Sequence, residues 1–340
     1  MTSSFQRIHG GPDQHGAPLF DFSTNSNACG PCPQALAAIG QADPTQYPDA
    51  GYTALRGQLA AFHDVDVRRV VLAASASEFI FRITSLAAQR GARAVSLPPH
   101  SYGDYAQAAR AHRLALVAQT DEAQLRWACE PSSPLGVAHE GLRSLPDRAA
   151  SAMLVLDRAY EPLRLDGAAA LTHAQLQSVW QLWTPNKALG LTGVRAAYAI
   201  APLGSDADAQ AMEALCPSWP VGSHGVAMLL AWISLDVRGW LAESLNTLRE
   251  WKKRQIALLE SSGWICEPSD ANFFCARPPG MEPPESLALA LALAQLRAQG
   301  IKLRDTTSFG LPGLVRVSVL PPAAQYALHN AWQHIIGKSA

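Results

Sequence analysis

Four side chains with complementary chemistry lie in the middle of the chain: Asp157, Tyr160, Lys187 and Arg195. Asp157 follows the apolar run 153–156, which predicts a strand, and Tyr160 comes shortly after it. A lysine amine can form a Schiff base with an aldehyde, and a carboxylate can pair with a protonated pyridine nitrogen. A tyrosine hydroxyl can reach a ring oxygen, and the planar fork of an arginine suits a phosphate.

These are the groups that pyridoxal 5′-phosphate (PLP) needs. We therefore expect Lys187 to bond to the cofactor aldehyde and Asp157 to pair with the ring nitrogen. Tyr160 would reach the phenolate oxygen of the ring, and Arg195 would bind the phosphate. Lys187, Asp157 and Tyr160 are thus the predicted catalytic residues. A solvated surface loop is the alternative explanation of the lysine or the aspartate taken alone.

Two more segments at predicted strand ends could contact the same cofactor, because ligands of open parallel sheets bind beyond the carboxyl ends of the strands. Residues 74–78 follow the strand expected at 70–73 and open a helix. The backbone amides of Ala76 and Ser77, with the Ser77 hydroxyl, could therefore bind a phosphate, although a plain helix N-cap has the same sequence pattern. Tyr102 could stack on the pyridine ring, and packing in the core is its alternative role.

Composition restricts the class of protein. The 340 residues are 48% hydrophobic and 16% charged, which fits one large and one smaller folded domain. A net charge of -1 argues against nucleic acid or a membrane surface as a partner. We find no apolar run long enough to span a membrane and no apolar signal segment at the start, so a cytoplasmic protein is expected.

The six cysteines predict neither a metal site nor a disulfide framework. Cys29 and Cys32 have the spacing of a redox dithiol, but the polar segment before them is turn-like, whereas such a dithiol usually follows a strand. The other cysteines are scattered without metal-ligand spacing. Free thiols are the expected state.

The pattern of apolar residues predicts an α/β fold. Continuous apolar strands alternating with helices indicate a largely parallel sheet covered by helices on both faces. Helices are expected at 52–63, 77–89, 103–111 and 138–145, and strands at 70–73, 94–97, 114–117, 125–129, 152–156, 179–183 and 196–200.

The last third of the chain predicts a smaller α+β domain. A long helical stretch is expected at 221–262, with helices at 284–299 and 323–336 and strands at 272–276, 301–304 and 314–319. We expect an amino-terminal arm at 1–35 that packs with the small domain, a large PLP-binding domain at 36–220 and a small domain at 221–340. Candidate buried positions of the long helical stretch are Trp232, Leu235, Leu241, Leu245 and Leu248.

From residue 9 to about 320 the chain resembles the fold-type-I PLP enzymes. Within them it is similar to the branch of histidinol-phosphate aminotransferase and threonine-phosphate decarboxylase. The sequence Leu-Asp-Arg-Ala-Tyr at 156–160 matches the family's strand-end aspartate motif, and Thr-Pro-Asn-Lys at 184–187 matches the segment of the Schiff-base lysine. This resemblance implies that Thr184 and Asn186 also contact the cofactor.

Single positions match as well. The resemblance assigns the cofactor phosphate to Arg195, the substrate carboxylate to Arg316, and the phosphate of a neighbouring subunit's cofactor to Tyr47, which implies a homodimer. Two positions depart from the family. Ser133 stands where an asparagine usually bonds the phenolate oxygen, and a serine would reach it only through a water. Asn186 replaces the usual Ser or Thr before the lysine.

The amino-terminal arm favours the decarboxylase side of this branch. His-Gly-Gly at 9–11 and Phe-Asp-Phe-Ser-Thr-Asn at 20–25 resemble a signature of the cobalamin-pathway enzymes, whose arm lies over the active site. The segment that begins at Leu303 resembles their carboxyl-terminal region, although aminotransferases carry a similar one. A flexible solvated terminus is the alternative for His9. The resemblance implies substrate contacts by His9, Asn25, Asn27, Arg304 and Arg316.

Three functions are open at this point. We expect decarboxylation of O-phospho-L-threonine to an aminopropanol phosphate in cobalamin biosynthesis. The alternative is an aminotransferase that acts on histidinol phosphate or an aromatic amino acid with 2-oxoglutarate. The departures at Ser133 and Asn186 leave a non-catalytic PLP-fold protein as the third.

Overall fold

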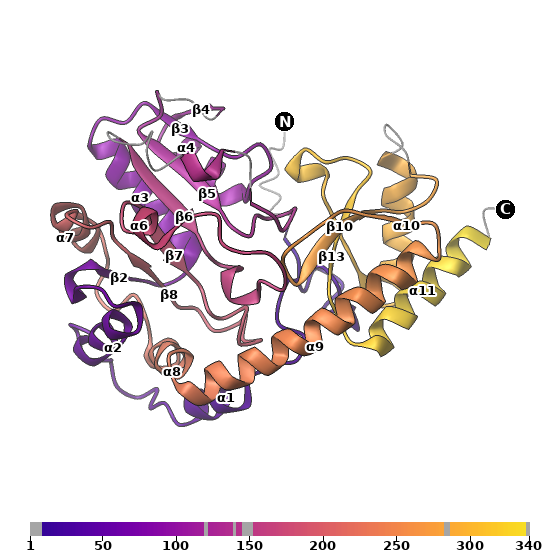
Figure 1. The fold of residues 1–340 in the computed structure, drawn as a ribbon, viewed down its shortest axis with the longest axis horizontal. Coiled ribbons are helices and arrows are strands. Elements are labelled where there is room, and N and C mark those ends of the chain that lie inside the picture. The colour runs from indigo at the N-terminus through magenta and orange to yellow at the C-terminus, as the bar shows by residue number, and fades with distance from the viewer. Residues whose placement is uncertain (1–8, 119–121, 139–140, 145–151, 282–285, 338–340) are drawn as a thin grey trace.

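The structure of the protein is a computed structural model, and it describes residues 9–118, 122–138, 141–144, 152–281 and 286–337. These residues form a large and a small sheet with their helices (Figure 1). The large sheet has the order β2-β8-β7-β6-β5-β3-β4, in which β8 is antiparallel to both neighbours and the other pairs are parallel. The predicted α/β class is therefore confirmed. The seven strands are β2 (Val70–Ala73), β3 (Ala94–Ser96), β4 (Ala115–Val117), β5 (Leu125–Cys129), β6 (Met153–Asp157), β7 (Trp180–Trp183) and β8 (Ala197–Ile200).

Helices cover both faces of this sheet. β2 is buried along its whole length, with Val71 and Ala73 in one core and Val70 and Leu72 in the other. This continuous apolarity is typical of a strand covered on both sides. The first core includes helices α3 (Ala76–Gln89), α4 (Gly103–Ala111) and α7 (Asp206–Ala214), and the second includes α1 (Pro33–Gly40), α2 (Thr53–His63) and α8 (Ser223–Trp232). A third, smaller core includes α6 (His173–Leu176).

The small domain follows a long helix, α9 (Leu235–Glu260), which in Figure 1 runs from the large sheet to the small one. At about 1.5 Å per residue it is roughly 39 Å long. The small antiparallel sheet has the order β12-β13-β10-β9, with bounds Arg304–Asp305, Val315–Ser318, Phe273–Arg277 and Ile265–Cys266. Helices α10 (Ser286–Ala298) and α11 (Pro322–Gly337) complete the domain.

The amino-terminal arm packs against the small domain. Its strand β1 (Phe20–Asp21) pairs in parallel with β11 (Ile301–Lys302). Asp13 forms ion pairs with Arg297 at 2.8 Å and Lys302 at 2.9 Å, and these contacts lower the pKa of the Asp13 carboxyl. The domain boundaries proposed above stay predictions.

Several expected elements differ from the structure. Where a helix was expected at 138–145, the described residues contain only the 3₁₀ turn η2 (Leu142–Ser144). The long stretch 221–262 is two helices, because Ser234 caps α9 and the chain bends by 71° between α8 and α9. Leu235 begins α9 and is 82% exposed, so its predicted burial is wrong.

The predictions for one strand of the last third of the chain and for one helix after the amino-terminal arm were also wrong. The strand expected at 301–304 divides into β11 and β12, which belong to different sheets. Helix α1 was missed inside a turn-rich segment. Short 3₁₀ turns occur at η1 (Val67–Arg69), η3 (Glu161–Leu163) and η4 (Thr307–Phe309). Among the described residues, no single helix has the length and apolarity of a membrane span, and α8 and α9 reach those limits only as a bent pair.

Candidate active site

A cavity of about 970 Å³ lies where β5 and β6 end and where the loop after β7 begins. The large domain, the arm and the small domain all contribute to its walls. Most of the predicted site residues line it: His9, Asn25, Ala76, Ser77, Tyr102, Ser133, Asp157, Tyr160, Thr184, Asn186, Lys187, Arg195, Arg304 and Arg316. Asn27 and Tyr47 do not.

Asp157 is buried at the end of β6, where two donors hold its carboxylate. Tyr105 Oη donates to Oδ2 at 2.6 Å, and the amide of Ala159 donates to Oδ1 at 2.9 Å. Burial raises the pKa of Asp157, whereas these hydrogen bonds and the charge of Lys187 act in the opposite direction. Tyr105 stacks on Trp127 with ring centroids 4.3 Å apart. The position of the carboxylate is therefore fixed by α4 and β5.

Lys187 lies in the loop after β7, and its amine faces the ring of Tyr160. Its Nζ is 5.2 Å from the centroid of that ring, and Tyr160 Oη accepts a hydrogen bond from Asn25 Nδ2 at 3.3 Å. The carbonyl of Lys187 accepts from the amide of Asn27 at 2.9 Å. The arm thus holds both the lysine loop and the tyrosine hydroxyl.

The structure corrects the role predicted for Asn27. Its Nδ2 donates to the carbonyl of Ala188 at 3.0 Å, and its Oδ1 accepts from the amide of Cys29 at 3.0 Å. The side chain is buried against backbone and does not reach the cavity. Asn27 therefore binds the lysine loop and not a substrate.

The amino terminus of α3 provides donors for an anion. Ser75 caps this helix by accepting from the amide of Glu78 at 3.1 Å, which leaves the hydroxyl of Ser77 available. That hydroxyl lies 3.4 Å from Tyr102 Oη. Helix amino termini bind phosphate through free amides and the helix dipole. Arg195 is exposed and lines the same cavity.

Orphaned polar atoms test whether PLP suits these residues. Buried polar atoms in proteins are nearly always hydrogen-bonded. Four cavity residues nevertheless each have a buried atom without a hydrogen-bond partner among the described residues: Asn25 Oδ1, Thr184 Oγ1, Asn186 Oδ1 and Arg316 Nε. A polar ligand with both donors and acceptors would pair with them. Together with the amine, carboxylate and phenol described above, this donor set fits PLP and an anionic substrate.

Two arginines of the small domain form the opposite wall. Arg304 on β12 and Arg316 on β13 are direct cross-strand partners. Their guanidinium carbons lie 4.9 and 5.8 Å from the centroid of the Phe309 ring. Burial lowers the pKa of Arg304 to about 10, and the positive charge of Arg316 adds to this effect. Two cations on one aromatic ring suit a ligand with two anionic groups.

Ser133 contacts the guanidinium of Arg316. Its Oγ accepts from Nη1 of Arg316 at 3.0 Å, and the carbonyl of Ser23 accepts from Nη2 at 3.0 Å. Ser133 thus orients the arginine, and its expected place near the phenolate oxygen stays a prediction, because the hydroxyl that accepts from Arg316 still has a proton to donate and lines the cavity. Asn186 donates through Nδ2 to the carbonyl of Val194 at 3.4 Å, which braces the lysine loop.

The arm and the loop after β3 close the cavity from two sides. His9 lines the cavity, and its ring centroid is 6.1 Å from that of Tyr102. The loop before Tyr102 also contacts the small domain, because His100 Nδ1 lies 2.7 Å from the carbonyl of Phe309. Residues from both domains thus meet at Phe309.

The sequence reasoning missed several lining residues, among them Tyr105, Cys129, Ser23 and Phe309. Tyr105 lies one helical turn beyond Tyr102, so the periodicity of α4 could have placed it on the same side. Cys129 ends β5 as Asp157 ends β6, and burial raises the pKa of its thiol well above the usual range. Ser23 and Phe309 lie in the two segments whose resemblance to the family was noted, 20–25 and the segment that begins at Leu303, but neither was singled out within them.

The remaining predicted groups lie outside the cavity. Tyr47 is 77% exposed and stacks on Trp219 with ring centroids 4.4 Å apart. It does not line the cavity of its own chain, so the homodimer stays a prediction. All six cysteines are free, and burial raises the pKa of Cys29. No cluster of His, Cys, Asp and Glu among the described residues could hold a metal ion.

The fold and the cavity define a fold-type-I PLP enzyme, and comparison with known families agrees. The family model for aminotransferase class I and II matches residues 17–335. The chain belongs to this family, whose cofactor is PLP.

Similar proteins of known sequence are histidinol-phosphate aminotransferases. That of Jannaschia sp. is 26% identical over 334 residues, covering 91% of this chain and 88% of the relative. That of Halorubrum lacusprofundi is 30% identical over 330 residues, covering 88% and 84%.

Two solved structures share the fold. Histidinol-phosphate aminotransferase from Sinorhizobium meliloti, in complex with PLP, has a TM-score of 0.79 at 22% identity and covers 93% of this chain and 90% of its own. L-Threonine-O-3-phosphate decarboxylase from Porphyromonas gingivalis has a TM-score of 0.75 at 20% identity, with 94% and 100% covered. At these identities the likeness shows the fold alone.

Proposed function

We propose that this PLP-dependent enzyme acts on an amino substrate that carries two anionic groups, one of them a phosphate ester or a second carboxylate. The observation behind the proposal is the pair Arg304 and Arg316 on one wall of the cavity that also contains Lys187. A single carboxylate would need only one of these guanidinium groups.

The residues around the cavity suggest how the cofactor would be held. Asp157 would pair with the ring nitrogen, and the amino terminus of α3 with Arg195 would bind the phosphate. When bound, PLP supplies an electron sink for a carbanion at the substrate α-carbon. Tyr160, whose hydroxyl accepts from Asn25, would donate to the ring phenolate oxygen.

The substrate would be oriented by the small domain. Arg316 donates one hydrogen bond from Nη1 to Ser133 and one from Nη2 to the carbonyl of Ser23. Its Nε has no hydrogen-bond partner among the described residues and would donate to a carboxylate. Arg304 would bind the second anion. The amine of Lys187 would move a proton at the substrate α-carbon, as a general base or acid.

Amino transfer is the first candidate reaction. The curated relatives described above are histidinol-phosphate aminotransferases, which reverses the order of preference given by the amino-terminal signature. Histidinol phosphate has a single anionic group, its phosphate, which would bind both arginines together. In the other half of the reaction, the two carboxylates of 2-oxoglutarate, and of the glutamate formed from it, would each use one arginine, so glutamate is the amino substrate with two anionic groups.

Decarboxylation of O-phospho-L-threonine is the second candidate, and the arm favours it. Residues His9, Gly10, Ser23, Thr24 and Asn25 line the cavity, in agreement with an arm that lies over a phosphorylated substrate. If Arg316 held the bond between the α-carbon and the carboxylate perpendicular to the cofactor ring, that bond would break, CO₂ would leave, and the α-carbon would take up a proton in its place.

Product analysis on one preparation decides between them. Purified protein loaded with PLP is given histidinol phosphate with 2-oxoglutarate, or O-phospho-L-threonine alone. Glutamate formation in the first mixture supports amino transfer, and CO₂ release in the second supports decarboxylation. Activity in neither mixture, with no spectral change of the cofactor on adding either substrate, would overturn the proposal of a two-anion amino substrate.

A further inference from the structure

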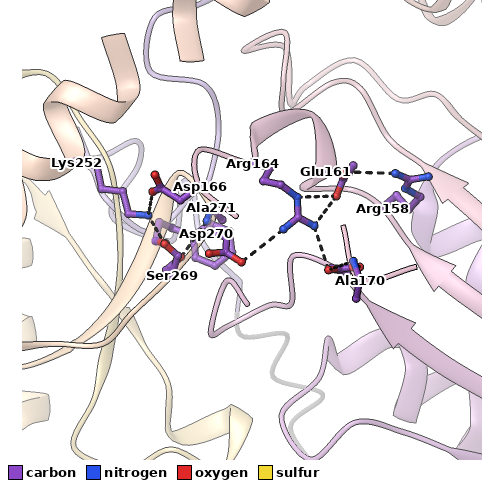
Figure 2. A network of polar contacts seen from close by, with 11 residues as sticks. Arg158, Glu161, Arg164, Asp166, Ala170, Lys252, Ser269, Asp270 and Ala271 are labelled. Atoms are coloured by element: carbon purple, nitrogen blue, oxygen red, sulfur yellow. Dashed lines mark hydrogen bonds and ion pairs between the residues drawn. The ribbon is translucent and has the colours of Figure 1, made fainter. Parts of the chain in front are cut away.

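A chain of ion pairs joins the large sheet to the small domain, with Arg164 at its centre (Figure 2). The Nη2 atom of Arg164 lies 2.7 Å from Glu161 Oε2 and 3.3 Å from Glu130 Oε1. Its Nη1 lies 3.5 Å from Asp270 Oδ2. One guanidinium therefore contacts three carboxylates from three separate segments.

Two of these segments carry cavity residues, and the third leads into the strand that pairs with Arg316. Glu130 directly follows Cys129 and precedes Ser133, and Glu161 directly follows Tyr160. Asp270 lies in the loop that leads into β10, whose central residues pair with β13 opposite Arg316. Arg164 itself lines no part of the cavity. Its influence on the site would therefore act through these three loops.

The contacts to the small domain go beyond the ion pair. The amide of Leu165 donates to the carbonyl of Asp270 at 2.6 Å, and the amide of Asp270 donates to the carbonyl of Gly136 at 2.8 Å. Gly136 has a φ of +78°, and a Cβ there would overlap Ser269 Oγ, so the two loops touch closely. Lys252 of α9 continues the chain of contacts to the carbonyl of Ser269 and to Asp166 (Figure 2).

The centre of the junction is buried, whereas the side chain of Asp270 is 31% exposed. The side chain of Arg164 is 10% exposed and that of Glu130 only 2%. Burial raises the pKa of Glu130, while the Ala170 amide and Arg164 act against it. A lysine could not replace the guanidinium, because an ammonium lacks the planar fork that reaches three acids at once.

We infer that Arg164 is a positioning residue that fixes Arg316 and Arg304 relative to the cofactor-binding strands. The inference rests on the proposed role of these two arginines. The cofactor contacts come mainly from the large domain, whereas the substrate anions would bind the small domain. Loss of the junction should therefore weaken substrate binding much more than cofactor binding.

The test uses variants that remove the ion pairs of the junction one at a time or all together. Arg164→Met removes all three contacts, and Asp270→Asn removes only the ion pair across the domains. Glu161→Gln removes only local ion pairs, those with Arg158 and Arg164. Arg69→Met is the matched control, because Arg69 is also buried but lies at the amino end of β2 and bonds to Ala201 and Gln177. The probe is succinate, an unreactive dicarboxylate.

Two dissociation constants are measured for each protein: that of PLP for the apoprotein, by tryptophan fluorescence, and that of succinate for the PLP-loaded protein, by the change in cofactor absorption. Arg164→Met should weaken succinate roughly tenfold, since a shift of about 1 Å in a positioned group can cost up to a hundredfold in rate. Arg164→Lys should recover only part of this loss. Asp270→Asn should weaken succinate at least about threefold, and both Glu161→Gln and Arg69→Met should stay near wild type. PLP affinity should change little throughout.

Hydrogen exchange of the PLP-loaded proteins, without any substrate, keeps this inference separate from the proposed function. Exchange over 304–318 should be faster in Arg164→Met and Asp270→Asn than in Glu161→Gln and Arg69→Met. If wild type does not bind succinate but the exchange pattern appears, the two-anion site is wrong and the positioning role stands. Equal exchange in all variants, or an Asp270→Asn protein that binds succinate as wild type does, would overturn the role of Arg164. If Arg164→Met does not fold, Asp270→Asn decides alone.

Discussion

Removing the hydroxyl of Tyr105 tests the site most directly, because this hydroxyl donates to the carboxylate that the cofactor ring would need. Tyr105→Phe removes the 2.6 Å hydrogen bond to Asp157 Oδ2 and leaves the stack on Trp127 in place. The amide of Ala159 still donates to the other oxygen. The substitution therefore changes the electrostatics of Asp157 with little change in packing.

The magnitude follows from the type of bond. A hydrogen bond to a charged group contributes about 1.5–3 kcal/mol, and a loss of about 1.4 kcal/mol is a factor of ten. Burial already raises the pKa of Asp157, and the bond from Tyr105 acts against this rise. Tyr105→Phe should raise the pKa of Asp157 further. PLP affinity should then fall about tenfold or more, and the loss should be larger at pH 6 than at pH 8, where more of Asp157 is ionised.

The same shift changes the stability of the apoprotein. A carboxyl whose folded pKa is raised contributes stability that is fully present below its unfolded pKa of about 3.9 and is lost as the pH rises through the folded pKa. In Tyr105→Phe this loss should extend to a higher pH than in wild type. Unfolding in urea at a series of pH values measures it.

The control is Tyr198→Phe. Tyr198 is fully buried and bonds to Trp232 Nε1 at 3.1 Å and to His63 Nε2 at 2.9 Å, and it does not line the cavity. It should lose stability while PLP affinity keeps its wild-type pH dependence. If Tyr105→Phe bound PLP as wild type does at both pH values, Asp157 would not be the partner of the ring nitrogen.

Three further predictions concern other parts of the molecule. Purified protein should be yellow, and borohydride should fix a pyridoxyl group on the peptide of Lys187; a label on another lysine would contradict the site. Arg316→Ala should lose roughly tenfold or more in kcat/KM, because a charge-assisted bond contributes about 1.5–3 kcal/mol; steady-state kinetics with an unchanged kcat/KM would show that the carboxylate binds elsewhere. Burial lowers the pKa of His63 to about 4, so its contribution to stability is present above the unfolded value near 6.5 and is lost as the pH falls toward 4. Chemical unfolding should show a flatter pH dependence in His63→Gln across this window, and an identical dependence in both proteins would contradict the burial argument.

The sequence predicted the elements of the large sheet well because its strands are rich in apolar residues, although β5 contains Arg126 and β7 contains Gln181. The strands at 70–73 and 125–129 and the helix at 103–111 were placed without error, and most other bounds moved by one or two residues. Of the stretch 138–145, where a helix was expected, residues 139, 140 and 145 lie outside the described part of the chain, and residues 142–144 form the turn η2. The prediction for Leu235 failed because a helix cap at Ser234 interrupts the periodicity and turns the first residue of α9 to solvent.

The site was predictable where chemistry is tied to a strand end, as for Asp157 and Lys187. The site was not predictable where side chains from separate strands or loops come together only in the folded structure. Nothing in the local sequence indicates that Arg304 and Arg316 become cross-strand partners, since the register of β12 and β13 decides this. Nothing indicates that Phe309 lies against both guanidinium groups, since its place depends on the turn η4.

Arg164 is a second case in which the folded structure, and not the local sequence, decides the contacts of a residue. Its sequence neighbours suggest only a local helix-type pair with Glu161, three residues away. The contact with Asp270, far along the chain, exists because the residue after η3, Arg164 itself, forms an antiparallel bridge with Ala271 in the loop before β10. A residue of this kind is invisible to motif reasoning, yet it joins the strands that would hold the cofactor to the strands that would hold the substrate. Specificity in this fold can therefore change through the junction while every residue of the cavity stays the same.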